Sequence, residues 1–266
     1  HERIARAMCE FSVLGFQSGS DRSNFVQYLV RHYDAVDEGD GWISVFGRRI
    51  RANAYPIGIE AEAFAKASVS QRASTAASRI GKFLGGRQLV LGVDRMDYSK
   101  GLPQRFEAVG KLFDHFPKTR GKVSVTQIAP PSRSKVEEYR DLRIQLDELA
   151  GRINGDYGDL DWIPLRYLAR SYDRRELAGL YRIASVCLVT PLRDGMNVVA
   201  KEFVMAQDPD NPGVLILSQF AGAAEQLSDT LIVNPHDSYN VAETIFQALE
   251  MPLEERKERW EKLRKT

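Results

Sequence analysis

The sequence predicts an α/β protein built on a doubly wound parallel sheet, and two observations lead to this class. From Gln88 onward, short apolar runs alternate with stretches of helical spacing, a pattern typical of parallel βαβ units. Polar clusters directly follow several of these apolar runs. In a parallel sheet of this class, the ligand-binding loops also follow the carboxyl ends of the strands. The chain has 266 residues, of which 43% are hydrophobic, enough for one large or two modest domains.

The first part of the chain is less regular and ends at a breaker-rich connection, Pro56-Ile57-Gly58-Ile59. We expect a domain boundary near Ile59, followed by an Ala-rich helical stretch at about Ala61–Phe83. Upstream of the boundary, residues 1–10 have the spacing of a helix end. The other elements predicted there are a strand at Phe11–Phe16, a helix at Asp21–His32 and two hairpin strands, Trp42–Phe46 and Arg49–Tyr55.

Downstream of the boundary, predicted strands and helices alternate. The strands are Leu89–Val93, Lys122–Ala129, Trp162–Tyr167, Val186–Val189, Val214–Leu217 and Leu231–Val233. The helices are Pro103–Phe116, Lys135–Asn154, Arg174–Ile183, Asn197–Gln207, a short one near Gly222–Gln226, Ser238–Leu249 and Leu253–Lys265. The run Arg152–Gly158 is interpreted as a helix C-cap and turn. The expected organisation is residues 1–59, residues 60–250 and a carboxy-terminal helix in 251–266.

Charge and composition argue against several classes of partner. The chain has 37 Lys and Arg against 36 Asp and Glu, so no general affinity for nucleic acid or an anionic membrane is expected. Cys9 and Cys187 lie in apolar surroundings without redox or metal spacing, and we expect buried thiols in a reducing, cytoplasmic protein. The four histidines form no metal-binding pattern, and no apolar run is long enough to cross a membrane.

The stretch Thr190–Phe203 carries the strongest functional signal. It follows an apolar strand, turns at Arg193-Asp194-Gly195 and becomes helical from Asn197, and the N-terminus of such a helix is a ready site for phosphate. Asp194 and Glu202 are separated by about two helical turns, roughly 12 Å of rise. The two carboxylates could hold a sugar hydroxyl and a ribose hydroxyl on either side of a diphosphate. The alternative is an ordinary turn with an N-cap aspartate and a surface glutamate.

Basic residues follow two other predicted strands. Arg95 and Lys100 lie in the loop after Leu89–Val93, and both could reach a diphosphate. Arg133, after Pro130-Pro131-Ser132, suits a second phosphate. The alternatives are a surface pair of Arg95 with Asp97, and an Arg133 that caps or pairs within the following helix.

Several enzyme classes have motifs that this sequence lacks. It has no GxSxG, no P-loop and no GxGxxG, which weighs against a serine hydrolase, an NTPase and a dinucleotide-binding enzyme. What the sequence predicts is an anion-binding crevice with two acidic anchors. That combination favours group transfer from a phosphorylated donor.

Five longer motifs occur in order: VDRMDYSKGLPQRFEA (93–108), TQIAPPSR (126–133), AGRINGDYG (150–158), LVTPLRDGMNVVAKEF (188–203) and NPGVLILSQFAGAAEQL (211–227). Together they resemble the trehalose-6-phosphate synthase family of retaining glycosyltransferases. The resemblance implies a GT-B fold, with the end of an amino-terminal lobe in residues 1–59 and a Rossmann-like donor lobe in 60–250. It also implies transfer of glucose from UDP-glucose to glucose 6-phosphate.

The resemblance assigns a role to each matching residue. Arg95, Lys100 and Asp194 correspond to the family's catalytic set, with Arg95 and Lys100 on the donor diphosphate and Asp194 on the glucose hydroxyls. The other implied donor contacts are the backbone of Gly195, Met196, Asn197, Val198 and Val199, Glu202 at the ribose, and Ile128 with Tyr172 near the uracil. Arg133 would bind the phosphate of the acceptor. The family implies no metal and no cofactor besides the nucleotide sugar.

Two small-molecule substrates are therefore the expected partners, and a homo-oligomer stays open. The family's amino-terminal lobe, with its HIPFP-type motif, is not found in these 266 residues, so we expect this piece to bind nucleotide sugar without completing transfer. One alternative is a related glucosyltransferase that uses ADP- or GDP-glucose, or a glycerol 3-phosphate acceptor. Another is a catalytically silent regulatory module, although Arg95, Lys100, Asp194 and Glu202 are all present.

Overall fold

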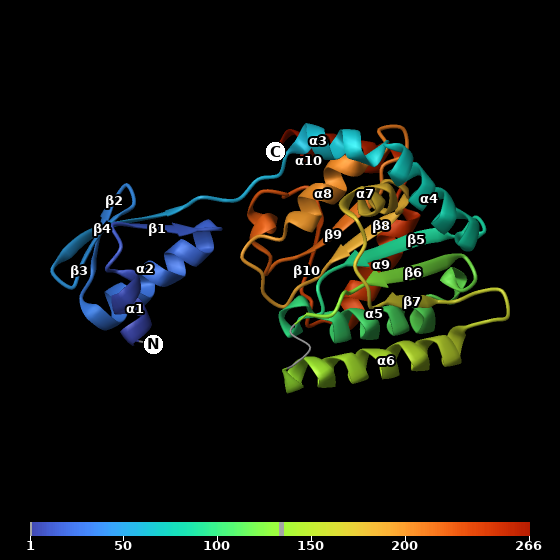
Figure 1. The fold of residues 1–266 in the computed structure, drawn as a ribbon, viewed down its shortest axis with the longest axis horizontal. Helices are drawn as coiled ribbons and strands as arrows, with labels where there is room; N and C mark the ends of the chain where they lie inside the picture. The colour runs from blue at the N-terminus through green and yellow to red at the C-terminus, as the bar shows by residue number, and fades with distance from the viewer. Residues whose placement is uncertain (1, 133–135) are drawn as a thin grey trace. The chain divides into compact units, whose positions relative to one another are not determined.

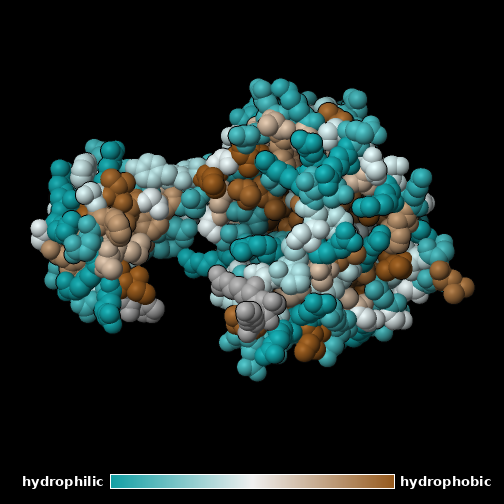
Figure 2. Space-filling view, in the orientation of Figure 1, coloured by the Kyte–Doolittle hydropathy of each residue, from teal (hydrophilic) through white to brown (hydrophobic). Residues whose placement is uncertain are grey.

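The computed structural model describes residues 2–132 and 136–266. The chain forms two compact units, one up to Gly58 and the other from Ile59 onward. In each unit, hydrophilic residues cover most of the visible face, and hydrophobic residues lie in separate patches (Figure 2). Among the helices formed by the described residues, none is both long and apolar enough to cross a membrane.

The smaller unit is a four-stranded mixed sheet with helices α1 (Glu2–Met8) and α2 (Gly19–Tyr33). In sheet order its strands are β1 (Val13–Phe16), β4 (Arg48–Ala54), β3 (Trp42–Val45) and β2 (Val36–Gly39). β1 runs parallel to β4, and the other neighbours are antiparallel. Ile43 and Ile50 on the hairpin pack with Leu29 of α2 in the core of this unit.

The predicted hairpin is confirmed, and the structure defines its turn. Val45 pairs with Arg48, which leaves Phe46 and Gly47 as the two turn residues, with φ of 52° and 72°. Positive φ at both central positions is the geometry that fits the right-handed twist of hairpin strands. β2 was not predicted, because all four of its residues are exposed and the strand carries no buried apolar face.

The larger unit contains, within the described ranges, one sheet of six parallel strands. In sheet order these are β10 (Leu231–Val233), β9 (Val214–Ser218), β8 (Val186–Val189), β5 (Gln88–Val93), β6 (Val123–Ile128) and β7 (Leu165–Leu168). The predicted α/β class with a parallel sheet is confirmed. β5 is central, and the chain winds outward from it in both directions, to β8 on one side and β6 on the other.

Two layers of helices cover the sheet (Figure 1). One layer contains α5 (Leu102–His115), α6 (Glu137–Tyr157) and α9 (Ser238–Glu250). The other contains α3 (Ala61–Ser68), α4 (Gln71–Leu84), α7 (Arg174–Ile183), α8 (Val198–Ala206) and α10 (Leu253–Lys265). Short 3-10 turns lie at η1 (Tyr98–Lys100), η2 (Pro117–Thr119) and η3 (Gly222–Glu225).

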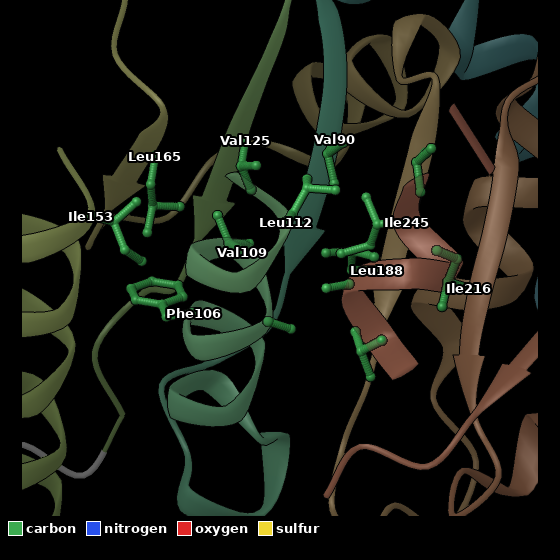
Figure 3. Close-up of a cluster of buried hydrophobic side chains, with 14 of the residues drawn as sticks. Val90, Phe106, Val109, Leu112, Val125, Ile153, Leu165, Leu188, Ile216 and Ile245 are labelled. Atoms are coloured by element: carbon green, nitrogen blue, oxygen red, sulfur yellow. The ribbon is translucent and has the colours of Figure 1, made fainter. Parts of the chain in front are cut away.

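Each helix layer buries an apolar core against its face of the sheet. In the first layer, Phe106 and Val109 of α5 face the β-strand residues Val125 and Leu165, and Ile245 of α9 lies beside Leu188 (Figure 3). Phe106 and Phe113 belong to this core, and both are at most 1% exposed. Cys9 and Cys187 are buried and unpaired, as predicted.

Several predicted boundaries shift by one or two residues, and three differ more. The stretch Ala61–Phe83 is two helices, because Ser70 begins α4 as an N-cap whose hydroxyl accepts from Ala73 N. The run Arg152–Gly158 is not a turn: α6 continues to Tyr157, and Gly158 ends it. The strand expected at 162–167 begins only at Leu165, since Trp162 instead buries its ring and donates from Nε1 to Val123 O at 2.9 Å.

Helices α4 and α7 approach each other closely at Gly179. A Cβ atom at Gly179 would lie 2.2 Å from the backbone oxygen of Ala73, a distance that no side chain tolerates. Since the obstacle is backbone, relief requires the two helices to move apart. Gly179 therefore sets the distance between α4 and α7.

We expect Gly179→Ala to lower the free energy of unfolding by about 1–3 kcal/mol, because overpacking forces the backbone to shift. The measurement is urea unfolding followed by circular dichroism. Gly110→Ala in α5 is the matched control, since its nearest obstacle, Ile153 Cγ1, is 3.7 Å away. The free energy of unfolding of the control should stay unchanged or rise by up to about 1 kcal/mol, because alanine has the higher helix propensity. Equal stability of the two variants would contradict the close-packing argument.

Candidate functional site

The loops after β5 and β8 meet at the carboxyl edge of the larger sheet. β5 lies between β8 and β6, so this edge is the point where strand order reverses and where ligands of open α/β sheets bind. The carbonyl oxygen of Ser99, in the loop after β5, accepts from Leu192 N at 2.8 Å and Arg193 N at 3.3 Å. These bonds join the two loops that carry Lys100 and Asp194.

A buried arginine lies beneath these loops. Arg105 of α5 is 2% exposed, and its Nε donates to Thr190 Oγ1 at 2.9 Å. Its Nη1 donates to Gln127 Oε1 at 2.8 Å and to Asp94 Oδ2 at 2.5 Å. The three acceptors come from the ends of β8, β6 and β5, so one guanidinium ties the three strand ends together.

Sequence reasoning missed Arg105, although a signal was present. Leu102, Arg105, Phe106 and Val109 occupy positions i, i+3, i+4 and i+7, so the arginine lies within the apolar stripe of α5. A charged residue in such a stripe must find a buried partner. The nearest acidic residue at a strand end, Asp94, is that partner.

Lys100, Asp194 and Asn197 form one hydrogen-bonded cluster. Lys100 Nζ lies 2.5 Å from Asp194 Oδ2, and Asn197 Nδ2 donates to the same oxygen at 3.0 Å. The side chains of Lys100 and Asp194 are 14% and 19% exposed, so the pair is largely shielded from water. No described residue donates to Asp194 Oδ1, which leaves that oxygen as an acceptor.

Backbone contacts fix the turn that contains Asp194, Gly195 and Met196. Asp194 N donates to Phe220 O at 3.1 Å, and Ala223 N donates to Met196 O at 2.8 Å. Gly222 permits this approach, because a Cβ there would lie 2.0 Å from Gly195 O. Gly222, the first residue of η3, therefore allows this turn to pack against the segment that follows β9.

Helix α8 begins at Val198 with an unusual N-cap. Asn197 holds φ at 75°, and its side chain makes no capping bond to the helix, because its amide donates to Asp194. Asp194 is therefore not the N-cap of α8, contrary to the alternative interpretation of the turn. The first-turn amides of Val198 and Val199 lie behind this turn without a side-chain cap from Asn197.

Glu202 lies about one turn after the start of α8 at Val198, because the helix does not include Asp194–Asn197, and it is paired with an arginine that sequence reasoning missed. Arg174 Nε is 3.3 Å from Glu202 Oε1, and the glutamate side chain is only 16% exposed. Burial raises the pKa of Glu202, and the positive charge of Arg174 and its hydrogen bond partly offset the rise. Arg174 is the first residue of α7, two residues after Tyr172, and it connects the predicted base and ribose positions.

The remaining predicted residues occupy separate positions. Ile128 ends β6 with a buried side chain, and its carbonyl accepts from Asp94 N at 3.0 Å. Tyr172 is half-buried beneath the guanidinium of Arg170. Arg95 is exposed, and no described residue pairs with it. Arg133 lies outside the described residues.

Asp97 shapes the turn that carries Lys100. Its Oδ1 accepts from Ser99 N at 3.0 Å, and its Oδ2 accepts from Tyr139 Oη at 3.0 Å. Partial burial alone would raise the pKa of Asp97, but the hydrogen bonds from Ser99 and Tyr139 and the charge of Lys100 lower it on balance. The surface pair of Arg95 with Asp97, considered as an alternative, is not formed. In the described ranges, no group of three or more His, Cys, Asp or Glu side chains could hold a metal ion.

The chain is similar to known glycosyltransferases over its whole length. A trehalose-6-phosphate synthase of Sinorhizobium fredii is 48% identical over 260 residues, which cover 98% of this chain and 56% of that protein. One from Cronobacter sakazakii is 47% identical over 253 residues, covering 95% and 53%. The chain thus spans about half the length of the curated relatives it matches.

Solved structures agree with the sequence comparison. An alpha,alpha-trehalose-phosphate synthase (UDP-forming) from Burkholderia xenovorans, in complex with glucose-6-phosphate, is 46% identical with a TM-score of 0.97. The match covers 100% of this chain and 60% of that one. An E. coli protein bound with UDP-2-fluoro glucose is 44% identical with a TM-score of 0.95, covering 99% and 58%. The predicted GT-B type agrees with this similarity.

One family model spans the chain. It is the model of glycosyltransferase family 20, and it matches residues 1–266. Together with the parallel sheet and the polar cluster at its carboxyl edge, this match shows that the chain belongs to glycosyltransferase family 20.

Proposed function

We propose that this chain is the donor-binding part of a trehalose-6-phosphate synthase. The reaction is transfer of glucose from UDP-glucose to glucose 6-phosphate with retention, which gives trehalose 6-phosphate and UDP. The observation that carries the proposal is the cluster of Lys100, Asp194 and Asn197 at the edge where β5 and β8 end. The ligands of the two relatives, glucose-6-phosphate and UDP-2-fluoro glucose, support the choice of substrates.

The diphosphate of the donor would bind where positive charge converges. Lys100 contributes a shielded ammonium group, and the amides of Val198 and Val199 contribute the positive end of α8. Arg95, exposed on the same loop as Lys100, can close on the diphosphate as a bidentate donor. We propose that these groups neutralise the leaving diphosphate without a metal ion.

The transferred sugar would bind at the turn of Asp194. Lys100 and Asn197 hold Oδ2, so the carboxylate is oriented and its Oδ1 can accept from a glucose hydroxyl. The Gly195-Met196 turn lies alongside, fixed by its bonds to η3. The ribose would bind at Glu202, and the uracil between the Ile128 backbone and Tyr172.

Catalysis in this proposal depends on position and charge and uses no protein nucleophile. The acceptor hydroxyl attacks the anomeric carbon on the face that the diphosphate leaves, and the departing phosphate oxygen takes the hydroxyl proton. Lys100 and Arg95 stabilise the negative charge that develops on that oxygen. Fixed donors in a largely shielded site need no reorganisation during this step.

We expect residues 1–266 to bind UDP-glucose, and Lys100→Gln to weaken binding about tenfold to a hundredfold, the range for losing a hydrogen bond to a charged group. The measurement is isothermal titration calorimetry. Lys118→Gln is the matched control, because Lys118 pairs with Glu250 on the surface and is not among the proposed donor-binding residues.

Three results would change the proposal. Folded wild-type protein that binds no nucleotide sugar would contradict the donor-binding role. Binding of ADP- or GDP-glucose in preference to UDP-glucose would favour a related glucosyltransferase. Binding of UDP-glucose by the complete protein without UDP release on addition of glucose 6-phosphate would favour a silent regulatory module.

The affinity for UDP-glucose should fall on acidification. The fall should begin at a higher pH than the pH at which an ordinary carboxyl group is protonated. The ribose hydroxyls need an ionised Glu202 as acceptor, and burial raises the pKa of this residue. Arg174→Gln removes the charge that offsets the rise, so the loss of affinity should move to still higher pH. The measurement is the dissociation constant between about pH 4.5 and pH 8.

Two variants test whether this shift belongs to Glu202. Arg174→Lys keeps a positive charge and should restore most of the wild-type profile. Glu202→Gln should weaken binding at every pH and remove the acid-dependent step. If the profiles of Arg174→Gln and wild type coincide, Arg174 does not control the ionisation of Glu202.

A further inference from the structure

A cavity lies beside the edge strand β7, away from the Lys100–Asp194 cluster. It has a volume of about 360 Å³ and is formed by α4, by β7 with the segment that follows it, and by α7. A second cavity of about 390 Å³ adjoins it and shares Ala76, Arg79 and Glu176. A volume of this order is that of a small-molecule site.

Three arginines line the cavity, and two of them are held by aromatic rings. The guanidinium carbon of Arg166 lies 4.4 Å from the ring centroid of Phe83, and that of Arg170 lies 4.9 Å from the ring centroid of Tyr172. Arg79 comes from α4. Stacking on a ring leaves the edge of a guanidinium, where its N–H donors lie, free to bind an anion.

The charge of these arginines is not neutralised by the described residues. No described carboxylate forms an ion pair with Arg79, Arg166 or Arg170. Glu176, the single acidic residue among the described lining residues, is already engaged. Its Oε2 accepts from Asp173 N at 3.1 Å and lies 4.0 Å from Arg72 Nη2. Three like charges around one cavity repel each other, and a bound anion would relieve that repulsion.

The floor of the cavity is apolar. Ile80 and Leu180 are at most 8% exposed, and they line the cavity together with Leu168. A ligand that fits both features carries a charged group for the guanidinium edges and a less polar body for the floor. Arginine forks match the oxygens of a phosphate, which they bind through two parallel hydrogen bonds.

We propose that this cavity is a second anion site, which binds a small organic phosphate separately from the nucleotide sugar. Arg95, Lys100, Asp194 and Glu202 do not line it. Tyr172 does, so the cavity borders the predicted base position through that one side chain. The binding site stands on its own geometry, and only its separation from the donor rests on the proposed function.

The test is calorimetric titration with inorganic pyrophosphate, in the absence and in the presence of saturating UDP. We expect pyrophosphate to bind in both cases. Arg79→Gln/Arg166→Gln should weaken the binding that persists with UDP by about tenfold or more, since two charged donors are lost. Arg140→Gln/Arg152→Gln on α6, in the other helix layer, removes the same charge and should leave it unchanged.

Each other outcome has a defined meaning. If saturating UDP abolishes pyrophosphate binding, the cavity is not a separate site. If both double variants weaken binding equally, the effect is general electrostatics and the proposal fails. Arg79→Gln alone, at an exposed position of α4, serves as the second variant if the double variant does not fold. If UDP does not bind, the donor proposal fails. The cavity is still tested by comparing pyrophosphate binding of the two variants, which Arg79→Gln should weaken more than Lys100→Gln.

Discussion

The carboxyl edge of the sheet depends on the buried guanidinium of Arg105. Taking a guanidinium out of water costs several kcal/mol unless acceptors replace the solvent. Here the acceptors are Asp94, Gln127 and Thr190, which end or follow three different strands, so the hydrogen bonds of Nε and Nη1 all form only when β5, β6 and β8 are aligned. Removing one partner of such a pair costs about 3–5 kcal/mol, because it leaves an unpaired charge in the interior. The alignment of the strand ends is thereby coupled to the stability of the unit.

The loops of the candidate site extend from these aligned strand ends. Ser99 joins the loop after β5 to the loop after β8, and the Gly195-Met196 turn is bonded to η3 after β9. Lys100 and Asp194 thus meet on loops whose backbones are already fixed at both sides. Positions fixed before a ligand arrives cost little entropy when it binds, which is what the nucleophile-free transfer that we propose would require.

The chain as a whole carries a formal charge of only +1. The charges that matter for binding are therefore local pairs and clusters. Carboxylates pair with cations at both ends of the predicted donor position, Asp194 with Lys100 and Glu202 with Arg174. The cavity at β7 is different, because two of its three arginines, Arg166 and Arg170, stack on rings, and none of the three pairs with a described carboxylate. Net charge therefore gives no indication of where this protein would bind anions; the local pairing pattern does.

Apolar periodicity in the sequence determined the α/β class and most elements of the larger unit. Strand β8 and helices α7 and α10 have the bounds predicted, and α7 does so because Asp173 and Glu176 form a capping box at its start. The motifs also named Lys100 and Asp194 as site residues, but the contact between them, across 94 positions of the chain, required the fold. The same holds for Arg105, for the Arg174–Glu202 pair and for β2, whose exposed residues have no apolar period. Local spacing determines which face of an element is apolar; which distant side chains then meet is decided by strand order and helix packing.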